Sequence, residues 1–156
     1  YLGTPDGLSA RIGLPVAEVE RIQKWYYGKF PEIKAWQDDI RKQVDTRRYI
    51  ENVFGYRYYI FGRVEGNTYN QAVAWKPQST VGCLINRAYV NIHENLPWAE
   101  VLLQVHDSLA GQYPTVLGDS AMAQIIEQAQ VPLPYDEPLI IPVGIKTSMK
   151  SWGACK

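Results

Sequence analysis

The spacing of apolar residues changes at Arg48, and this change limits the possible folds more than any other feature of the sequence. Before it, apolar residues follow helical spacing after Pro15 and again after Pro31, which predicts two helices. After it, residues 49–54 and 57–61 are rich in β-branched and aromatic side chains with a glycine between them, which predicts a β-hairpin. The chain therefore combines helices with strands.

A long helix is predicted over residues 68–95, where an apolar stripe recurs at helical spacing. Pro77 lies inside this segment and is expected to kink or break the helix, because proline lacks a backbone donor and clashes with the preceding turn. Residues 1–13, rich in glycine, are interpreted as turns.

Strand and helix signals alternate again in the last third of the chain. Residues 101–113 predict two short strands, Asp119 is expected to be the N-cap of a helix that ends at Gln130, and residues 139–146 predict a final strand. This order predicts an α+β fold in which helices cover one face of an antiparallel sheet.

Composition sets only loose limits on function. Lysine and arginine total 16 against 16 aspartates and glutamates, and the resulting zero net charge does not by itself indicate a nucleic-acid binder. Charge is uneven, however, because the segment from Asp119 to Glu137 is acidic and a basic stretch precedes it, so a basic face is possible. The basic residues of that stretch are Lys42, Arg47, Arg48, Arg57 and Arg63.

The two cysteines form no CxxC pair, and no apolar run is long enough to predict a membrane span.

Residues 104–109 are the strongest candidate for a functional site. An apolar strand runs into His106 and Asp107 and then resumes as a second apolar strand. A charged carboxylate is costly there unless it meets a cation or a partner, and metal-assisted phosphoryl transfer needs a rigidly held carboxylate. That chemistry needs at least one more carboxylate, because two Mg²⁺ ions flank the reacting phosphate. The alternative is that both residues belong to an ordinary turn, which aspartate favours.

Gln104-Val105-His106-Asp107 resembles the motif that ends the palm of family A, polymerase I-like DNA polymerases, where an apolar strand leads to His-Asp-Glu. Four further segments resemble that family in the same order along the chain. They are residues 1–33, similar to the segment after the fingers helix; residues 49–57, similar to a Gly-x-Arg strand and turn; Pro77-Gln78-Ser79-Thr80, similar to Pro-x-Gln-Gly-Thr on the helix along the minor groove; and residues 143–153, similar to the terminal strand and closing tryptophan. The tail favours the shorter, phage-like members.

The resemblance implies an incomplete piece of a polymerase domain, with fingers-side helices over 1–47 and the antiparallel palm sheet within 48–156. It implies that Asp107 is a catalytic ligand for Mg²⁺ and that His106 is a catalytic residue at the primer end. Template-directed nucleotidyl transfer to a primer 3′ end would be the activity, in the cytoplasm of a bacterial or phage-infected cell and with no membrane partner.

The resemblance also implies three DNA-binding residues. Gln78 would reach the minor-groove side of the primer–template, where every base pair presents acceptors that a glutamine can sense without reading sequence. Thr80 lies on the same motif, and Arg57 would hold a backbone phosphate.

Two departures from the family pattern affect the expected activity. Ser108 stands where the family usually has glutamate, which leaves a weaker carboxylate cluster. The family's other catalytic aspartate and its nucleotide-binding helix lie upstream of the matched segments. We therefore expect the chain to be inactive alone, to share two Mg²⁺ ions with an upstream or separate polymerase chain, and to expose apolar surface where missing strands belong. Primer–template DNA, deoxynucleoside triphosphates and that complementary chain are the expected partners.

Two other functions stay open from the sequence. One is a remnant that binds duplex DNA without chemistry, for which Gln78, Arg57 and the basic stretch would suffice. The other is a structural partner that completes a polymerase fold.

Overall fold

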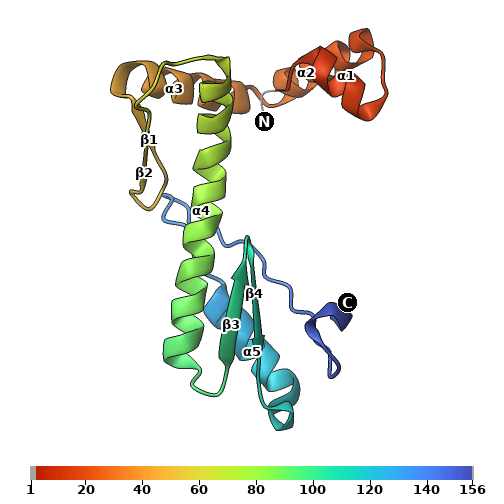
Figure 1. Ribbon diagram of the computed structural model, residues 1–156, viewed down its shortest axis with the longest axis vertical. Coiled ribbons are helices and arrows are strands. Elements are labelled where there is room, and N and C mark those ends of the chain that lie inside the picture. Colours follow the sequence, from red (N-terminus) through yellow and green to blue (C-terminus); the bar gives the residue numbers. More distant parts are fainter. Residues whose placement is uncertain (1–2, 156) are drawn as a thin grey trace. The chain divides into compact units, whose positions relative to one another are not determined.

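The computed structural model describes residues 3–155, which form two compact units that divide between Pro77 and Gln78. Unit 1, up to Pro77, holds α1 (Pro5–Ile12), α2 (Val16–Lys29), α3 (Pro31–Arg47), β1 (Tyr49–Glu51), β2 (Arg57–Tyr59) and the start of α4 (Gly66–Asn95) (Figure 1). Unit 2 holds the rest of α4, β3 (Glu100–Val105), β4 (Ser108–Gln112), the short 3-10 helix η1 (Thr115–Leu117), α5 (Gly118–Ala129) and η2 (Trp152–Ala154). Within the described residues the strands form two separate antiparallel pairs, which confirms the predicted α+β class.

Helix α1 corrects the interpretation of the first thirteen residues as turns. Thr4 is its N-cap, and the Thr4 hydroxyl accepts a hydrogen bond from the Gly7 N–H at 3.2 Å. Pro5 follows at the first helical position, and Gly13 closes the helix with a φ of 73°, a left-handed conformation that glycine adopts without steric cost. These start and stop signals stand in the sequence and outweigh its glycine content.

The helices predicted after Pro15 and Pro31 are confirmed as α2 and α3. In α2 only Val19 is buried, although its apolar residues recur at helical spacing. In α3 the apolar stripe is buried at Ile40 and Val44, toward the C-terminal end of the helix. Periodicity therefore located both helices but did not show how much of each stripe is covered.

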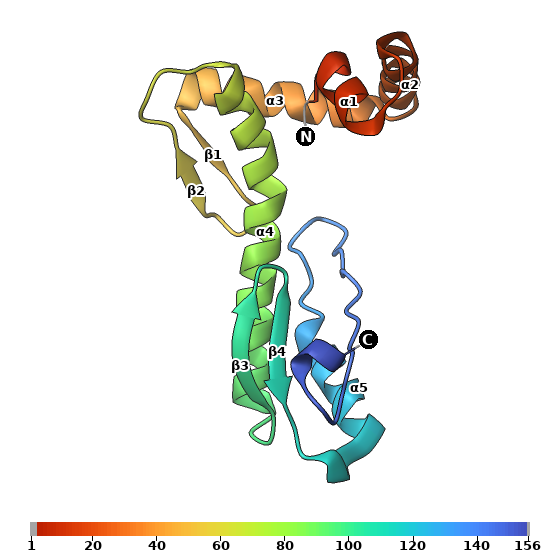
Figure 2. The same cartoon turned by 45° about the vertical axis from the view of Figure 1, so that its right-hand side comes forward.

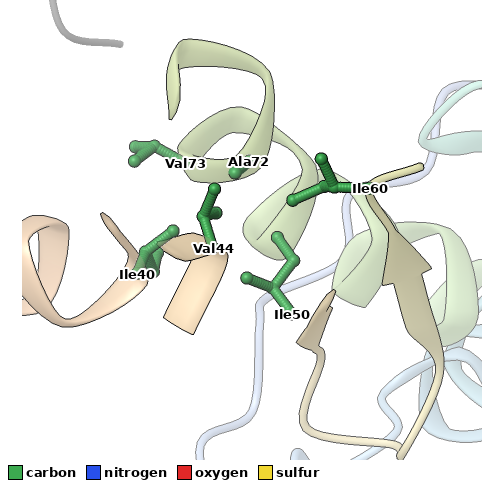
Figure 3. Close-up of a cluster of buried hydrophobic side chains, with 6 residues drawn as sticks. All are labelled: Ile40, Val44, Ile50, Ile60, Ala72 and Val73. Atoms are coloured by element: carbon green, nitrogen blue, oxygen red, sulfur yellow. The ribbon is translucent and has the colours of Figure 1, made fainter. Parts of the chain in front are cut away.

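The core of unit 1 joins α3, the first hairpin and the start of α4. Ile40 and Val44 come from α3, and the other four side chains point toward them from the hairpin and from α4 (Figure 3). Those four are Ile50, Ile60, Ala72 and Val73. Tyr58 packs against this cluster and stacks on Trp75, with 5.6 Å between the ring centroids.

The β1–β2 hairpin has the predicted place and a register that pairs Tyr49 with Tyr59 and Glu51 with Arg57. Asn52 holds its turn, since its side-chain oxygen accepts hydrogen bonds from the N–H groups of Phe54 and Tyr56 at 3.0 and 3.1 Å. Side chains alternate between the two faces of a strand, so residues 50, 58 and 60 share the face that covers the core. Residues 49, 51, 57, 59 and 61 lie on the opposite face.

Helix α4 continues through Pro77, so the helix does not break there, and of the predicted kink or break only the kink stays a prediction. It begins two residues earlier than predicted, where the Thr68 hydroxyl accepts a hydrogen bond from the Glu65 N–H at 3.1 Å, as in one half of a capping box. A proline inside a helix costs about 3 kcal/mol, and burial along both parts of α4 offsets this cost. Ala72 and Val73 are buried before Pro77, and Leu84, Ala88 and Ile92 are buried after it.

The β3–β4 hairpin confirms the strands predicted over residues 101–113. Its register shifts between Val101 and Leu103, so Leu102 is the extra residue of a β-bulge. The bulge needs Gly111, because a Cβ atom there would lie 2.5 Å from the carbonyl oxygen of Glu100. Figure 2 shows this hairpin as the principal sheet of unit 2.

The last part of the chain differs from its prediction in two ways. Helix α5 begins at Gly118, so Asp119 lies inside the first turn and is not the N-cap. Its carboxylate there still complements the positive end of the helix dipole. The final strand predicted over residues 139–146 does not form, and only an isolated bridge joins Leu139 to Leu133. Pro142 removes a ladder donor from this exposed segment.

Candidate functional site

His106 and Asp107 form the two-residue turn between β3 and β4, with Val105 paired to Ser108 directly below them. His106 has a φ of 53°, and Asp107 is absent from the described non-glycine residues with positive φ. A positive φ at only the first central position is typical of type II′ turns, which usually take glycine there. Histidine tolerates this region better than most residues, but such a backbone commonly marks a functional position.

The turn presents both candidate catalytic side chains to solvent. His106, Asp107 and Ser108 are all exposed, and apolar residues of both strands lie behind them. The Ser108 hydroxyl donates a hydrogen bond to the Val105 carbonyl oxygen at 2.8 Å and so ties the two strand ends together. The structure thus brings His106 and Asp107 side by side at a fixed strand end, as the sequence predicted.

Within residues 3–155, no three histidine, cysteine, aspartate or glutamate side chains gather in a way that could hold a metal ion. Asp107 therefore does not belong to a group of three or more such side chains among the described residues. Mg²⁺ prefers six oxygen ligands and is usually held by one or two carboxylates together with substrate phosphates. The residues that the structure describes do not by themselves fit a site for two Mg²⁺ ions.

Gln78 and Thr80 lie on α4, just after Pro77, and their accessibility differs. Gln78 is exposed and can reach a ligand. Thr80 is only 6% exposed, because it faces the buried side of the helix. Its assignment as a DNA contact stays a prediction, and its position suits packing better than it suits contact with a large ligand.

Arg57 lies on β2 in unit 1, while the other four candidate residues belong to unit 2. Its Nε atom donates a hydrogen bond to Glu51 at 2.7 Å, and its guanidinium lies 4.9 Å from the centre of the Tyr49 ring. The hydrogen bond to Glu51 is the main reason that the pKa of Arg57 lies above its usual range. Arg57 is therefore a permanent cation that Glu51 partly neutralises.

Sequence reasoning noted the tyrosines beside Arg57 as possible base-stacking residues, but it missed the pairing of Arg57 with Glu51 and did not predict which aromatic side chains share its face. Tyr49, Tyr59 and Phe61 lie on the same face of the hairpin as this ion pair. The alternating pattern of residues 57–61 contains the signal, because every second residue of a strand points to the same side. Unit 2 also exposes apolar side chains: Leu102 and Leu103 of β3 are 65% and 46% exposed.

No helix in the described part of the chain is long and apolar enough to cross a membrane.

Comparison with known proteins links nearly the whole chain to one family. Residues 1–153 match the family described as DNA polymerase family A. The thermostable DNA polymerase I of Thermus filiformis is 30% identical over 146 residues, which cover 88% of this chain and 18% of that protein. The corresponding enzyme of Thermus aquaticus is 27% identical with the same coverage, and DNA polymerase I of Pseudomonas aeruginosa is 25% identical over 149 residues. The chain spans less than a fifth of the length of these curated relatives.

A solved structure has a similar fold. The POL domain of Pol1 from M. smegmatis, in complex with DNA primer-template and dNTP, superposes with a TM-score of 0.76. The match covers 87% of this chain and 26% of that one at 20% sequence identity. This likeness supports the fold of helices with small antiparallel sheets.

Proposed function

Because the chain belongs to DNA polymerase family A, we propose that it forms the C-terminal part of a polymerase I-like polymerase domain, with the end of the fingers in residues 1–47 and palm elements in 48–156. The observation that carries this proposal is the exposed His106-Asp107 turn between two antiparallel strands. A rigid strand end holds a carboxylate more accurately than a long loop can. Such a carboxylate suits template-directed nucleotidyl transfer to the 3′ end of a primer.

In this proposal Asp107 supplies one carboxylate to a Mg²⁺ site that residues outside this chain complete. Bound Mg²⁺ would neutralise charge on the transferred phosphoryl group. His106 lies next to Asp107 with its backbone set by the turn, and its imidazole would position the primer end. The Ser108 hydroxyl contributes by fixing the strand ends beneath both residues.

The proposed partners are primer–template DNA and a deoxynucleoside triphosphate, the two ligands with which the similar POL domain from M. smegmatis forms its complex. Gln78 is exposed on α4, where its amide could donate to minor-groove acceptors of any base pair. Arg57 would contact a backbone phosphate, and its hydrogen bond to Glu51 would weaken as it did so. The remaining part of a polymerase domain is the proposed protein partner. Cytoplasmic location and a phage-like origin stay predictions.

A second candidate function is binding of duplex DNA without chemistry. It is favoured by the lack of a metal-holding group of side chains within residues 3–155 and by Ser108 at the usual glutamate position. The same Gln78 and Arg57 contacts would then give weak, salt-sensitive binding. The two functions predict different results only when the rest of the polymerase domain is supplied, because only the catalytic function then predicts primer extension.

Primer extension with the chain alone and with a polypeptide that supplies the rest of a family A polymerase domain tests this proposal. Activity with Mg²⁺ and four nucleotides is expected only in the mixture. Extension by neither sample, with duplex binding retained, would favour the second function. Extension by the chain alone would contradict the predicted dependence on residues outside it.

A further inference from the structure

The exposed face of the β1–β2 hairpin carries a row of aromatic rings that no buried core uses. Tyr49 and Tyr59 pair across the strands with 5.6 Å between ring centroids, and Phe61 continues the row 6.0 Å from Tyr59 at an interplanar angle of 22°. Phe61 is 92% exposed and Tyr59 is 49% exposed. Cross-strand packing explains the contact between Tyr49 and Tyr59, but it does not explain a phenylalanine that is almost wholly exposed in this chain.

The opposite face of the same hairpin already serves the core. Ile50 and Ile60 are buried among α3 and α4 residues, and Tyr58 stacks on Trp75. The aromatic row is therefore surplus to the folding of unit 1. An exposed row of rings on a rigid hairpin is an arrangement that offers flat surfaces to a ligand.

Cations lie at both ends of the aromatic row. The Arg57 guanidinium lies over the Tyr49 ring, 4.9 Å from its centre. At the other end, Arg48 donates a hydrogen bond to the carbonyl oxygen of Gly62, the residue after Phe61. Residues 47–63 contain four arginines and a single acidic residue, Glu51. The charge of this segment therefore complements a polyanion, and the exposed rings offer surfaces on which its flat groups can stack.

We infer that Tyr49, Tyr59 and Phe61 form a platform on which the unpaired bases of single-stranded DNA stack, while the flanking arginines attract its phosphates. Alternating aromatic and basic side chains are typical of surfaces that bind single strands without sequence preference. The inference deepens the proposed function. It rests on that function in one respect only, which is that the single strand is the template beyond the duplex. Apolar partner proteins fit this surface less well, because its rings are bordered by charge.

Fluorescence anisotropy of a labelled oligothymidylate with the full 156-residue chain tests the platform. The double variant Phe61→Leu, Tyr59→Leu is expected to bind roughly 5- to 150-fold more weakly, the range expected when one base-stacking contact is lost. Trp25→Leu is the matched control, because Trp25 is a comparably exposed aromatic of α2 outside the platform, at 65% exposure. Circular dichroism of all variants checks the fold, which exposed side chains should not affect.

An abasic oligonucleotide of the same length separates stacking from charge. The wild-type chain is expected to bind it about as weakly as the double variant binds oligothymidylate. Equal binding of both oligonucleotides, or equal binding by wild type and double variant, would overturn the platform. Loss of oligothymidylate binding when the rest of a polymerase domain is added would also overturn it, since protein would then cover the face. Binding needs no catalysis, so retained stacking in a mixture that fails to extend primers would refute the proposed function while supporting the platform.

Discussion

The Ser108 hydroxyl donates a hydrogen bond to the Val105 carbonyl oxygen, 2.8 Å away across the turn that carries His106 and Asp107. The serine that the motif resemblance places at the family's glutamate position thus has a structural role of its own. It ties the end of β3 to the start of β4 directly below the candidate catalytic pair. The same position cannot provide both this hydrogen bond and a carboxylate.

Ser108→Glu is expected to exchange one role for the other. In the mixture with the rest of a polymerase domain, the added carboxylate should lower the Mg²⁺ concentration that gives half-maximal primer extension, because anionic oxygens are preferred ligands of this ion. Loss of the exposed hydrogen bond should cost at most about 1 kcal/mol of folding stability. Ser108→Ala is the control for that loss, and identical Mg²⁺ dependence in the wild type and the glutamate variant would contradict a metal site beside Asp107.

The turn conformation predicts how substitutions of His106 affect stability. Its φ of 53° suits glycine, so His106→Gly should be about 1 kcal/mol more stable than His106→Ala in urea denaturation, where alanine keeps the unfavourable Cβ contact. Both variants should extend primers poorly in the mixture, because neither carries an imidazole. If the alanine and glycine variants were equally stable, the backbone at position 106 would not be held in a left-handed conformation.

The β-bulge predicts opposite results for two glycine-to-alanine substitutions. Gly111→Ala should destabilise unit 2 by about 1–3 kcal/mol, since its Cβ atom would lie 2.5 Å from the Glu100 carbonyl oxygen. Gly82→Ala, in α4 with no heavy atom within 4 Å of the added Cβ, should stabilise the protein by about 0.5–1 kcal/mol. Thermal unfolding measures both changes, and a neutral Gly111→Ala would argue against the bulge at Leu102.

The hydrogen bond between Tyr69 and Asp45 predicts a pH dependence in unit 1. The Tyr69 hydroxyl donates to the Asp45 carboxylate at 2.7 Å, and this bond raises the pKa of Tyr69. Its stabilising contribution is therefore fully present below the ordinary tyrosine pKa of about 10 and is lost as pH rises through the higher folded-state pKa.

Tyr69→Phe should consequently be less stable than the wild type at neutral pH, and the difference should shrink in alkaline solution. Urea denaturation from pH 7 to above pH 10 measures this, with the exposed Tyr135→Phe as the matched control. A stability difference that stays constant across this range would show that the bond to Asp45 does not control Tyr69.

Much of the fold could be predicted because the strongest signals are local. Helices after Pro15 and Pro31 and the two hairpins follow from periodicity, which also placed His106 and Asp107 in a turn. The strand expected over residues 139–146 failed because a strand needs a partner, and apolar composition does not supply one. In α1 the opposite happened, since Thr4 and Gly13 capped a helix that glycine content had concealed.

The candidate site was predictable only as far as residue types and neighbours in sequence allow. Asp107 and His106 share one turn, so their proximity followed from the sequence. The burial of Thr80, the pairing of Arg57 with Glu51 and the bulge at Leu102 depend on helix rotation and strand register. A one-residue shift in register exchanges the faces of a strand, and sequence patterns alone do not set it.

The rate of single-nucleotide incorporation by the mixture, compared for Asp107→Asn and Asp136→Asn, tests the central claim most directly. Both are exposed aspartates of unit 2, but only Asp107 lies in the turn beside His106. The proposed metal site predicts a loss of more than about 100-fold for Asp107→Asn, because metal-held charge contributes several kcal/mol to the transition state, and no loss for Asp136→Asn. Incorporation by Asp107→Asn at the rate of the control variant would contradict the assignment of Asp107 as a catalytic ligand.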